Sequence, residues 1–158
     1  PDKHDPNVLH FAKHVKVCPY DWGSSIESIL ECTAAEENIR TTITSQKTQQ
    51  KQQCPSTPSD ELFDVIVAAD CCYMPEYHPM LLESIHRLLH PSRGVALLPF
   101  ALHSNTADER VWGILNAARD FGFRVEVLEA QQLTPQASHM DSKRALVHTV
   151  RLTHHDQE

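Results

Sequence analysis

Residues 65–69 form a short apolar run that ends at a carboxylate, Asp70, and this run restricts the possible folds more than any other segment. It is rich in β-branched residues and too short for a helix. That pattern is typical of a strand buried on both faces, as in a parallel sheet. In open α/β sheets, ligands bind at the edge where the carboxyl ends of the strands meet. Asp70 and Tyr73 are therefore predicted to lie at the mouth of a binding crevice.

The segments that follow this run alternate between helix and strand patterns. Apolar residues at helical spacing predict a helix over residues 76–90, and residues 95–100 are predicted to be a second buried strand whose pairing ends at Pro99. A capping box at residues 106–109 predicts the start of another helix, which Gly122 ends. Alternation at residues 123–127 and 146–152 predicts an antiparallel pair at a sheet edge, joined by a polar loop over residues 130–143. The fold class is therefore α/β.

The first 60 residues are less regular. Residues 15–17 alternate like a strand, and Ser24 or Ser25 is a candidate N-cap for a helix that follows. Residues 41–59 are rich in glutamine and contain two prolines, so they are predicted to be a disordered insertion and not a domain boundary. At 158 residues, we expect residues 1–158 to form one domain.

Charge and cysteine content argue against several classes of function. A formal net charge of -7 disfavours nonspecific binding to nucleic acid or to anionic membranes, and no apolar run approaches membrane-spanning length. The five cysteines lack metal-type spacing, so we expect a cytoplasmic or nuclear location and no metal. Adjacent Cys71 and Cys72 would point to opposite faces of an extended segment, which is poor chelation geometry. They are predicted to be small packing residues.

Three motifs together resemble a known family. Asp21-Trp22-Gly23, Phe63-Asp64 and Ala69-Asp70-x-x-Tyr73 are similar to the class I, seven-strand methyltransferases that modify protein lysines and carry an Asp-x-x-Tyr motif. The second half resembles the branch of that family that methylates calmodulin. This further likeness is carried by Ala69-Asp70-Cys71, Tyr77, Arg87-Leu88-Leu89-x-Pro91-x-Arg93-Gly94, Asn105-Thr106, Gly122-Phe123 and Leu152-Thr153-x-His155.

The resemblance implies a Rossmann-like sheet, S-adenosylmethionine as methyl donor, and a protein lysine as acceptor. Calmodulin is the first candidate substrate, and the protein is expected to act as a monomer. Carried over residue by residue, the family's adenine pocket would use Asp21 and Trp22 on one side and Ala69 on the other. Asp70 would frame the channel in which donor and amine meet, and Tyr73 would form the substrate side.

Two parts of the family pattern are matched less directly. The family's ribose-binding acid ends its second strand, and Asp2 is the nearest candidate, with Asp5 as the alternative. The glycine-rich loop that cradles the methionine portion of the donor has no counterpart among the four glycines. The resemblance therefore implies a partial domain that lacks the first strands. In the family's strand order, residues 65–69 would then be an unpaired apolar edge prone to aggregation.

Each site residue also has an ordinary structural interpretation. Asp70 is compatible with a turn cap, Tyr73 with a half-buried packing residue, and Asp21-Trp22-Gly23 with a turn around an indole. Two alternatives for function stay open. One is the same chemistry on another protein target, and the other is a truncated, non-catalytic fragment that acts by binding partners.

Overall fold

The computed structural model describes residues 15–32, 62–102, 106–132 and 145–155. The chain divides into two compact units, which are described separately: a smaller one of Pro1–Asp21 and Ser25–Gln53, and a larger one of Trp22–Ser24 and Cys54–Glu158. Asp2, Asp5 and the glutamine-rich insertion lie outside the described residues.

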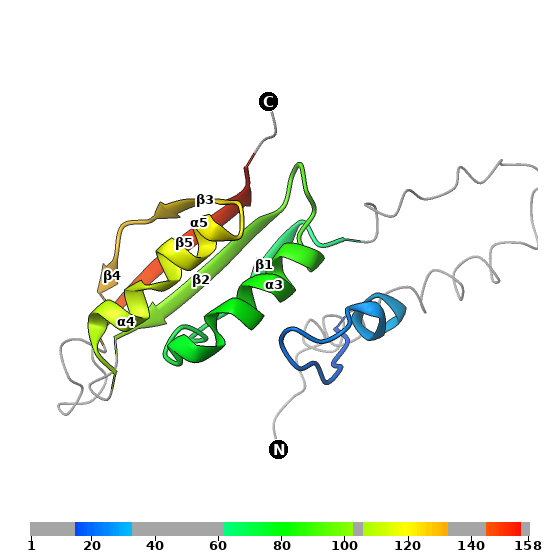
Figure 1. Ribbon diagram of the computed structural model, residues 1–158, viewed down its shortest axis with the longest axis horizontal. Coiled ribbons are helices and arrows are strands. Elements are labelled where there is room, and N and C mark those ends of the chain that lie inside the picture. The colour runs from blue at the N-terminus through cyan, green and yellow to red at the C-terminus, as the bar shows by residue number, and fades with distance from the viewer. Residues whose placement is uncertain (1–14, 33–61, 103–105, 133–144, 156–158) are drawn as a thin grey trace, which may run out of the picture. The chain divides into compact units, whose positions relative to one another are not determined.

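The larger unit contains a mixed sheet with strand order β1-β2-β5-β3, and β4 pairs with β5 (Figure 1). β1 and β2 are parallel, whereas β5 is antiparallel to β2, β3 and β4. The predicted α/β class and the antiparallel pairing of the last two long strands are confirmed. However, β5 lies between β2 and β3 and not at an edge. The strands are β1 (Val65–Val67), β2 (Val95–Ala101), β3 (Phe123–Val127), β4 (Gln131–Gln132) and β5 (Leu146–His154).

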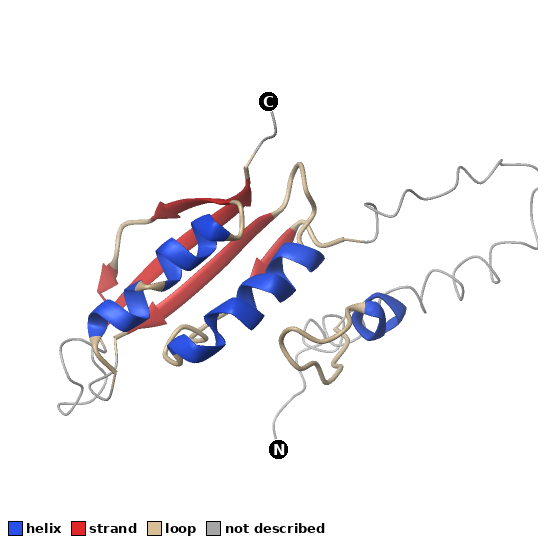
Figure 2. Ribbon diagram, in the orientation of Figure 1, coloured by secondary structure: helices blue, strands red, loops and turns tan. Residues whose placement is uncertain are grey.

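The helices of this unit lie against one face of the sheet (Figure 2). None of the described helices is long and apolar enough to cross a lipid bilayer. The predicted helix over residues 76–90 is confirmed, although a short 3-10 turn precedes its α-helical part. The elements are η2 (Pro75–Tyr77), α3 (His78–Leu88), α4 (Asp108–Trp112) and α5 (Ile114–Asp120).

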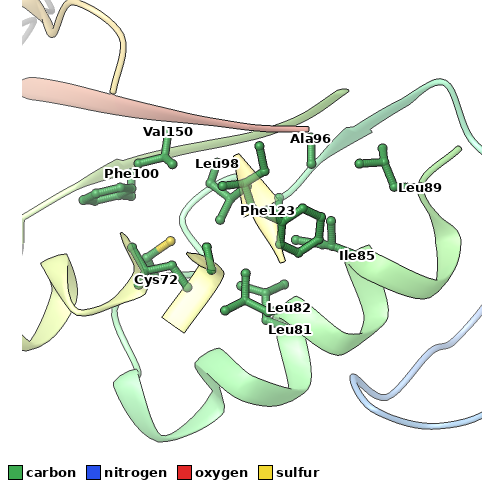
Figure 3. Close-up of a cluster of buried hydrophobic side chains, with 14 of the residues drawn as sticks. Cys72, Leu81, Leu82, Ile85, Leu89, Ala96, Leu98, Phe100, Phe123 and Val150 are labelled. Atoms are coloured by element: carbon green, nitrogen blue, oxygen red, sulfur yellow. The ribbon is translucent and has the colours of Figure 1, made fainter. Parts of the chain in front are cut away.

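The core fills the space between these helices and the sheet (Figure 3). Leu82 and Leu98, from α3 and β2, have no exposed surface, and Ile85 is 2% exposed. Fully burying one such aliphatic side chain contributes roughly 1.5–3 kcal/mol, so this layer provides much of the fold's stability. The other members labelled in Figure 3 are Cys72, Leu81, Leu89, Ala96, Phe100, Phe123 and Val150.

The opposite face of β1 is open, which corrects the prediction that this strand is covered on both faces. Val65 and Val67 are each 61% exposed, whereas Ile66 and Ala68 pack with the core. Because alternate residues of a strand point to opposite sides, a layer of helices on one face covers only every second residue. β1 also lies at the end of the strand order among the described residues.

The predicted capping box does not cap a helix. Ala107 is the N-cap residue of α4 without a side-chain cap, and the Thr106 hydroxyl instead donates to the carbonyl oxygen of Tyr73 at 3.3 Å. The expected single helix is also divided at Gly113 into α4 and α5. Gly122, in contrast, follows α5 with a φ of 81°, as predicted for a residue that ends a helix.

Two other strand predictions need correction. β2 stays paired with β5 through Ala101, beyond Pro99. The Pro99 carbonyl accepts from the Asp70 N–H, so the missing N–H of the proline faces the β1 side and leaves the β5 ladder intact. The loop predicted over residues 130–143 begins with the short strand β4.

In the smaller unit, residues 15–17 do not form a strand, and Val17 is 92% exposed. An alternating pattern alone is therefore insufficient to form a strand where no described strand pairs with the segment. The helix that follows is confirmed over residues 27–32, and the Ser25 hydroxyl accepts from the Glu27 N–H at 3.3 Å.

Candidate functional site

The loop that follows β1 holds Asp70 in an unusual conformation. Its N–H donates to the carbonyl oxygen of Pro99 at 2.7 Å, which continues the strand pairing up to the loop. Among the described residues, Asp70 is the one non-glycine residue with a positive φ, at 54°. Left-handed backbone costs an L-residue roughly 1–2 kcal/mol, although aspartate and asparagine tolerate it better than most. Such strain is concentrated at functional sites, and the side chain of Asp70 is exposed here.

Ala69 and Tyr73 lie on the same loop. Ala69 is exposed, and its carbonyl oxygen accepts from the Cys71 thiol at 3.3 Å. Tyr73 is 45% exposed, and its backbone is fixed by the Thr106 hydroxyl that precedes α4. Three of the predicted site residues, Ala69, Asp70 and Tyr73, are therefore together at the carboxyl end of β1.

Trp22 belongs to the larger unit and lies in a turn that α3 holds. The Gly23 N–H donates to the Ser84 hydroxyl at 2.8 Å, and the Ser24 carbonyl accepts from the Arg87 guanidinium at 3.1 Å. The indole side of this turn is not buried, since Trp22 is 36% exposed. A partly exposed, anchored indole has the flat apolar surface on which an adenine ring can stack.

Two predicted residues remain, Asp21 and Asp2. Asp21 is exposed within the smaller unit, and Asp2 lies outside the described residues. The described residues include Trp22 and the Asp70 loop, which the resemblance assigns to the nucleoside end of a methyl donor. They offer no glycine cradle for the methionine end, because Gly94, Gly113 and Gly122 lie in turns before β2 and at the ends of α5.

The neighbouring cysteines are packing residues, as predicted. Cys72 has no exposed surface, and burial, followed by the nearby Cys71 and Asp70, raises the pKa of its thiol to about 12. Burial and the Asp70 carboxylate also raise the pKa of the Cys71 thiol. In the described part of the chain, no group of three or more histidine, cysteine or acidic residues is arranged to hold a metal ion.

A hollow of about 490 Å³ lies at the other end of the sheet. It is close to the carboxyl end of β5, which is antiparallel to β2 and therefore ends where β2 begins. None of the predicted site residues lines it. Its lining residues are Leu62, His86, Leu89, Pro91, Ser92, His154 and His155.

Sequence reasoning missed the residues that anchor the candidate site residues through hydrogen bonds. Ser84 and Arg87 anchor the Trp22 turn, and Thr106 anchors the Tyr73 backbone. A serine within a helix whose neighbours are buried leucines was a weak signal of this role, because serine is a poor helix former. Its partner in the turn was not readable from the sequence.

Comparison with known proteins identifies a family. A family model described as lysine methyltransferase matches residues 8–111, more than half of the chain. No curated protein matches the chain significantly.

Two solved structures are also similar to the chain. One is precorrin-6y C5,15-methyltransferase from Geobacter metallireducens, with 16% identity over 76% of this chain and 59% of that chain and a TM-score of 0.41. The other is a methyltransferase from Pyrococcus furiosus, with 19% identity over 80% of this chain and 57% of that chain and a TM-score of 0.40. The chain therefore spans less than two thirds of the length of either.

Proposed function

The chain belongs to the lysine methyltransferase family, and on that premise we propose that it transfers a methyl group from S-adenosylmethionine to a lysine side chain of another protein. The observation that carries the proposal is Asp70, an exposed carboxylate in left-handed backbone at the carboxyl end of β1, inside the matched segment. Calmodulin is the first candidate substrate, because the second half of the sequence resembles the branch that methylates it. A lysine of a different protein is the alternative.

The proposed chemistry depends chiefly on positioning. The lysine ammonium would first lose a proton to solvent. The neutral nitrogen would then form a bond to the methyl carbon of the sulfonium donor as the carbon–sulfur bond breaks, which leaves a methylated ammonium and S-adenosylhomocysteine. Correct alignment of two reactants can account for roughly 7–11 kcal/mol of the barrier. In our proposal, Asp70 accepts a hydrogen bond from the lysine amine and orients it. The face of Tyr73 lies beside the methylated, cationic product, a contact worth roughly 0.5–2 kcal/mol, and Trp22 stacks on the adenine.

Two measurements test this function. Isothermal titration with S-adenosylhomocysteine, the demethylated donor, is expected to show binding in the micromolar range. Methyl transfer from tritiated donor to calmodulin is expected in the wild type and to be lost in Asp70→Asn. The matched control is Asp64→Asn, which removes an exposed carboxylate that pairs with the exposed Arg93 at the opposite end of β1.

A second candidate function is a non-catalytic one, in which the chain binds protein partners without a donor. It is favoured by the lack of a glycine cradle among the described residues. A folded sample that binds no S-adenosylhomocysteine would support this candidate and contradict the enzyme. Transfer to other lysine-containing proteins but not to calmodulin would support the enzyme and exclude its first candidate substrate.

A further inference from the structure

Ser84 lies in the middle of α3, where it is only 4% exposed. Serine is a poorer helix former than alanine, and a buried hydroxyl needs hydrogen-bond partners. The Ser84 hydroxyl donates to the carbonyl oxygen of Met80 at 2.8 Å, one helical turn earlier, and accepts from the Gly23 N–H at 2.8 Å. The second bond joins residues 61 positions apart, so one hydroxyl connects the helix to the turn that contains Trp22.

The turn is held on both sides of Gly23. Gly23 has a φ of 80°, and a Cβ at this position would lie 3.3 Å from the Met80 side chain, so the turn is pressed closely against α3. Arg87, which is on the same face of the helix as Ser84, donates to the carbonyl oxygen of Ser24 at 3.1 Å. The Gly23 N–H belongs to the peptide group that follows the α-carbon of Trp22. Its bond to Ser84 therefore fixes the backbone from which the indole projects.

We propose that Ser84 is a positioning residue for the methyl donor. By holding the peptide between Trp22 and Gly23, its hydroxyl sets the direction of the Trp22 indole and, through it, the affinity for the adenine ring. Stacked rings interact favourably only within a limited range of distances and offsets, so a turn that drifts loses contact with its ligand. This role rests on the proposed function and deepens it. Ser84 itself does not touch the donor.

The first test measures the anchoring bond without any donor. Amide hydrogen exchange at Gly23 is followed by nuclear magnetic resonance in the wild type, Ser84→Ala, Ser84→Cys and Ser84→Thr. Alanine removes the acceptor, and cysteine keeps the side-chain volume but accepts weakly, so both should increase the exchange rate. Threonine keeps a hydroxyl and should restore protection. Ser92→Ala is the control. Ser92 lies in the turn after α3, and its hydroxyl makes a long contact of 3.4 Å with a ring nitrogen of His90 and not with the Trp22 turn.

The second test measures the consequence for binding. Removing one neutral hydrogen bond is expected to weaken S-adenosylhomocysteine binding about three- to tenfold in Ser84→Ala and Ser84→Cys, with Ser84→Thr close to the wild type. In turnover assays, the KM for the donor should rise while kcat changes little, because the alignment of the acceptor lysine does not depend on this turn.

Three results would overturn the assignment. If the Gly23 exchange rate is unchanged in both Ser84→Ala and Ser84→Cys, the Ser84 hydroxyl does not hold the turn. If exchange is faster but the Kd for S-adenosylhomocysteine is unchanged, Ser84 has a purely structural role. An equal loss of affinity in Ser84→Thr, at an unchanged melting temperature, would show that the hydroxyl is not what matters. Absence of donor binding by the wild type would contradict the proposed function, whereas Gly23 exchange would still decide whether Ser84 holds the turn.

Discussion

Asp70 combines left-handed backbone with an exposed acidic side chain. Its backbone is left-handed, with a φ of 54°, a conformation in which glycine is most stable. It nevertheless carries a charged side chain that the loop keeps exposed. A carboxylate at a position where glycine would relieve strain supports the role that we propose for this side chain.

Substitutions at Asp70 should separate stability from activity. Asp70→Asn should keep the unfolding free energy within about 0.5 kcal/mol, since asparagine also tolerates this backbone. Asp70→Val should lower the unfolding free energy by about 1–2 kcal/mol relative to Asp70→Gly, because a β-branched residue is strained at positive φ. All three variants should lose methyl transfer. Urea unfolding and the tritium assay measure the two effects, and equal stabilities of the valine and glycine variants would contradict the account.

At the residue scale, the sequence indicated candidate site residues but not the residues that hold them by hydrogen bonds. Asp70 and Tyr73 were identified because an apolar run leads directly to them. Ser84 was not, because its essential partner, Gly23, is 61 residues away and no local pattern encodes that contact. The role of Thr106 was predicted wrongly for a similar reason. Its hydroxyl is bound to the Tyr73 carbonyl in the folded chain and is not available to cap α4.

Among the elements, α3 connects the two ends of the sheet. One face of it contributes Leu82 and Ile85 to the core, and a neighbouring stripe holds the Trp22 turn. Its last turn reaches β5, where the rings of His86 and His154 meet edge to face with centroids 4.7 Å apart. The helix itself was predictable from its apolar spacing. Its contacts with β5 were not, because they depend on β5 entering the sheet beside β2.

The junction of α3 with β5 should make stability depend on pH. Burial is the largest cause that lowers the pKa of His154, followed by the proximity of His86, and His90 lowers it further. The hydrogen bond to the Leu89 carbonyl raises this pKa, but by less than burial and His86 lower it. Protonating His154 is therefore harder in the folded chain than in the unfolded one. Stability should be full above the ordinary histidine pKa of about 6.5 and should fall as the pH drops from there through the folded-state pKa.

Thermal melts at pH 7.5 and pH 5.5 check this dependence. The loss in Tm on acidification should be smaller in His154→Gln than in the wild type. His155→Gln, which changes the exposed neighbour, should lose as much as the wild type. An identical decrease in Tm on acidification in both variants and the wild type would show that protonation of His154 is not the cause of the pH dependence.

The end of α5 gives a second prediction at the level of elements. Gly122 has a φ of 81°, and a Cβ added there would meet nothing within 4 Å. Gly122→Ala should therefore destabilise the fold only through its backbone, by about 1–2 kcal/mol. Gly122→Asn should cost less, because asparagine tolerates left-handed backbone. Chemical denaturation of the two variants measures the difference, and a larger loss for asparagine would contradict this explanation.

For the larger unit as a whole, the sheet is covered on one face and apolar on part of the other. The sequence correctly predicted a strand in the run of residues 65–69, although β1 covers only Val65–Val67, and it wrongly predicted burial on both faces. An apolar run indicates which residues favour burial, but it does not indicate whether another element covers them. Val65 and Val67 therefore remain 61% exposed on a strand at the end of the described sheet.

This open face should make the chain self-associate. Burying a valine side chain contributes roughly 1.5–3 kcal/mol, so contacts between two such faces are favourable. The double variant Val65→Thr and Val67→Thr keeps β-branched residues in β1 and should reduce association while changing the melting temperature little. Light scattering over a concentration series measures the difference. Val127→Thr is the control, because Val127 is 48% exposed but lies on the other face of the sheet. A monodisperse wild type, or equal association in all three proteins, would show that this face is not the contact.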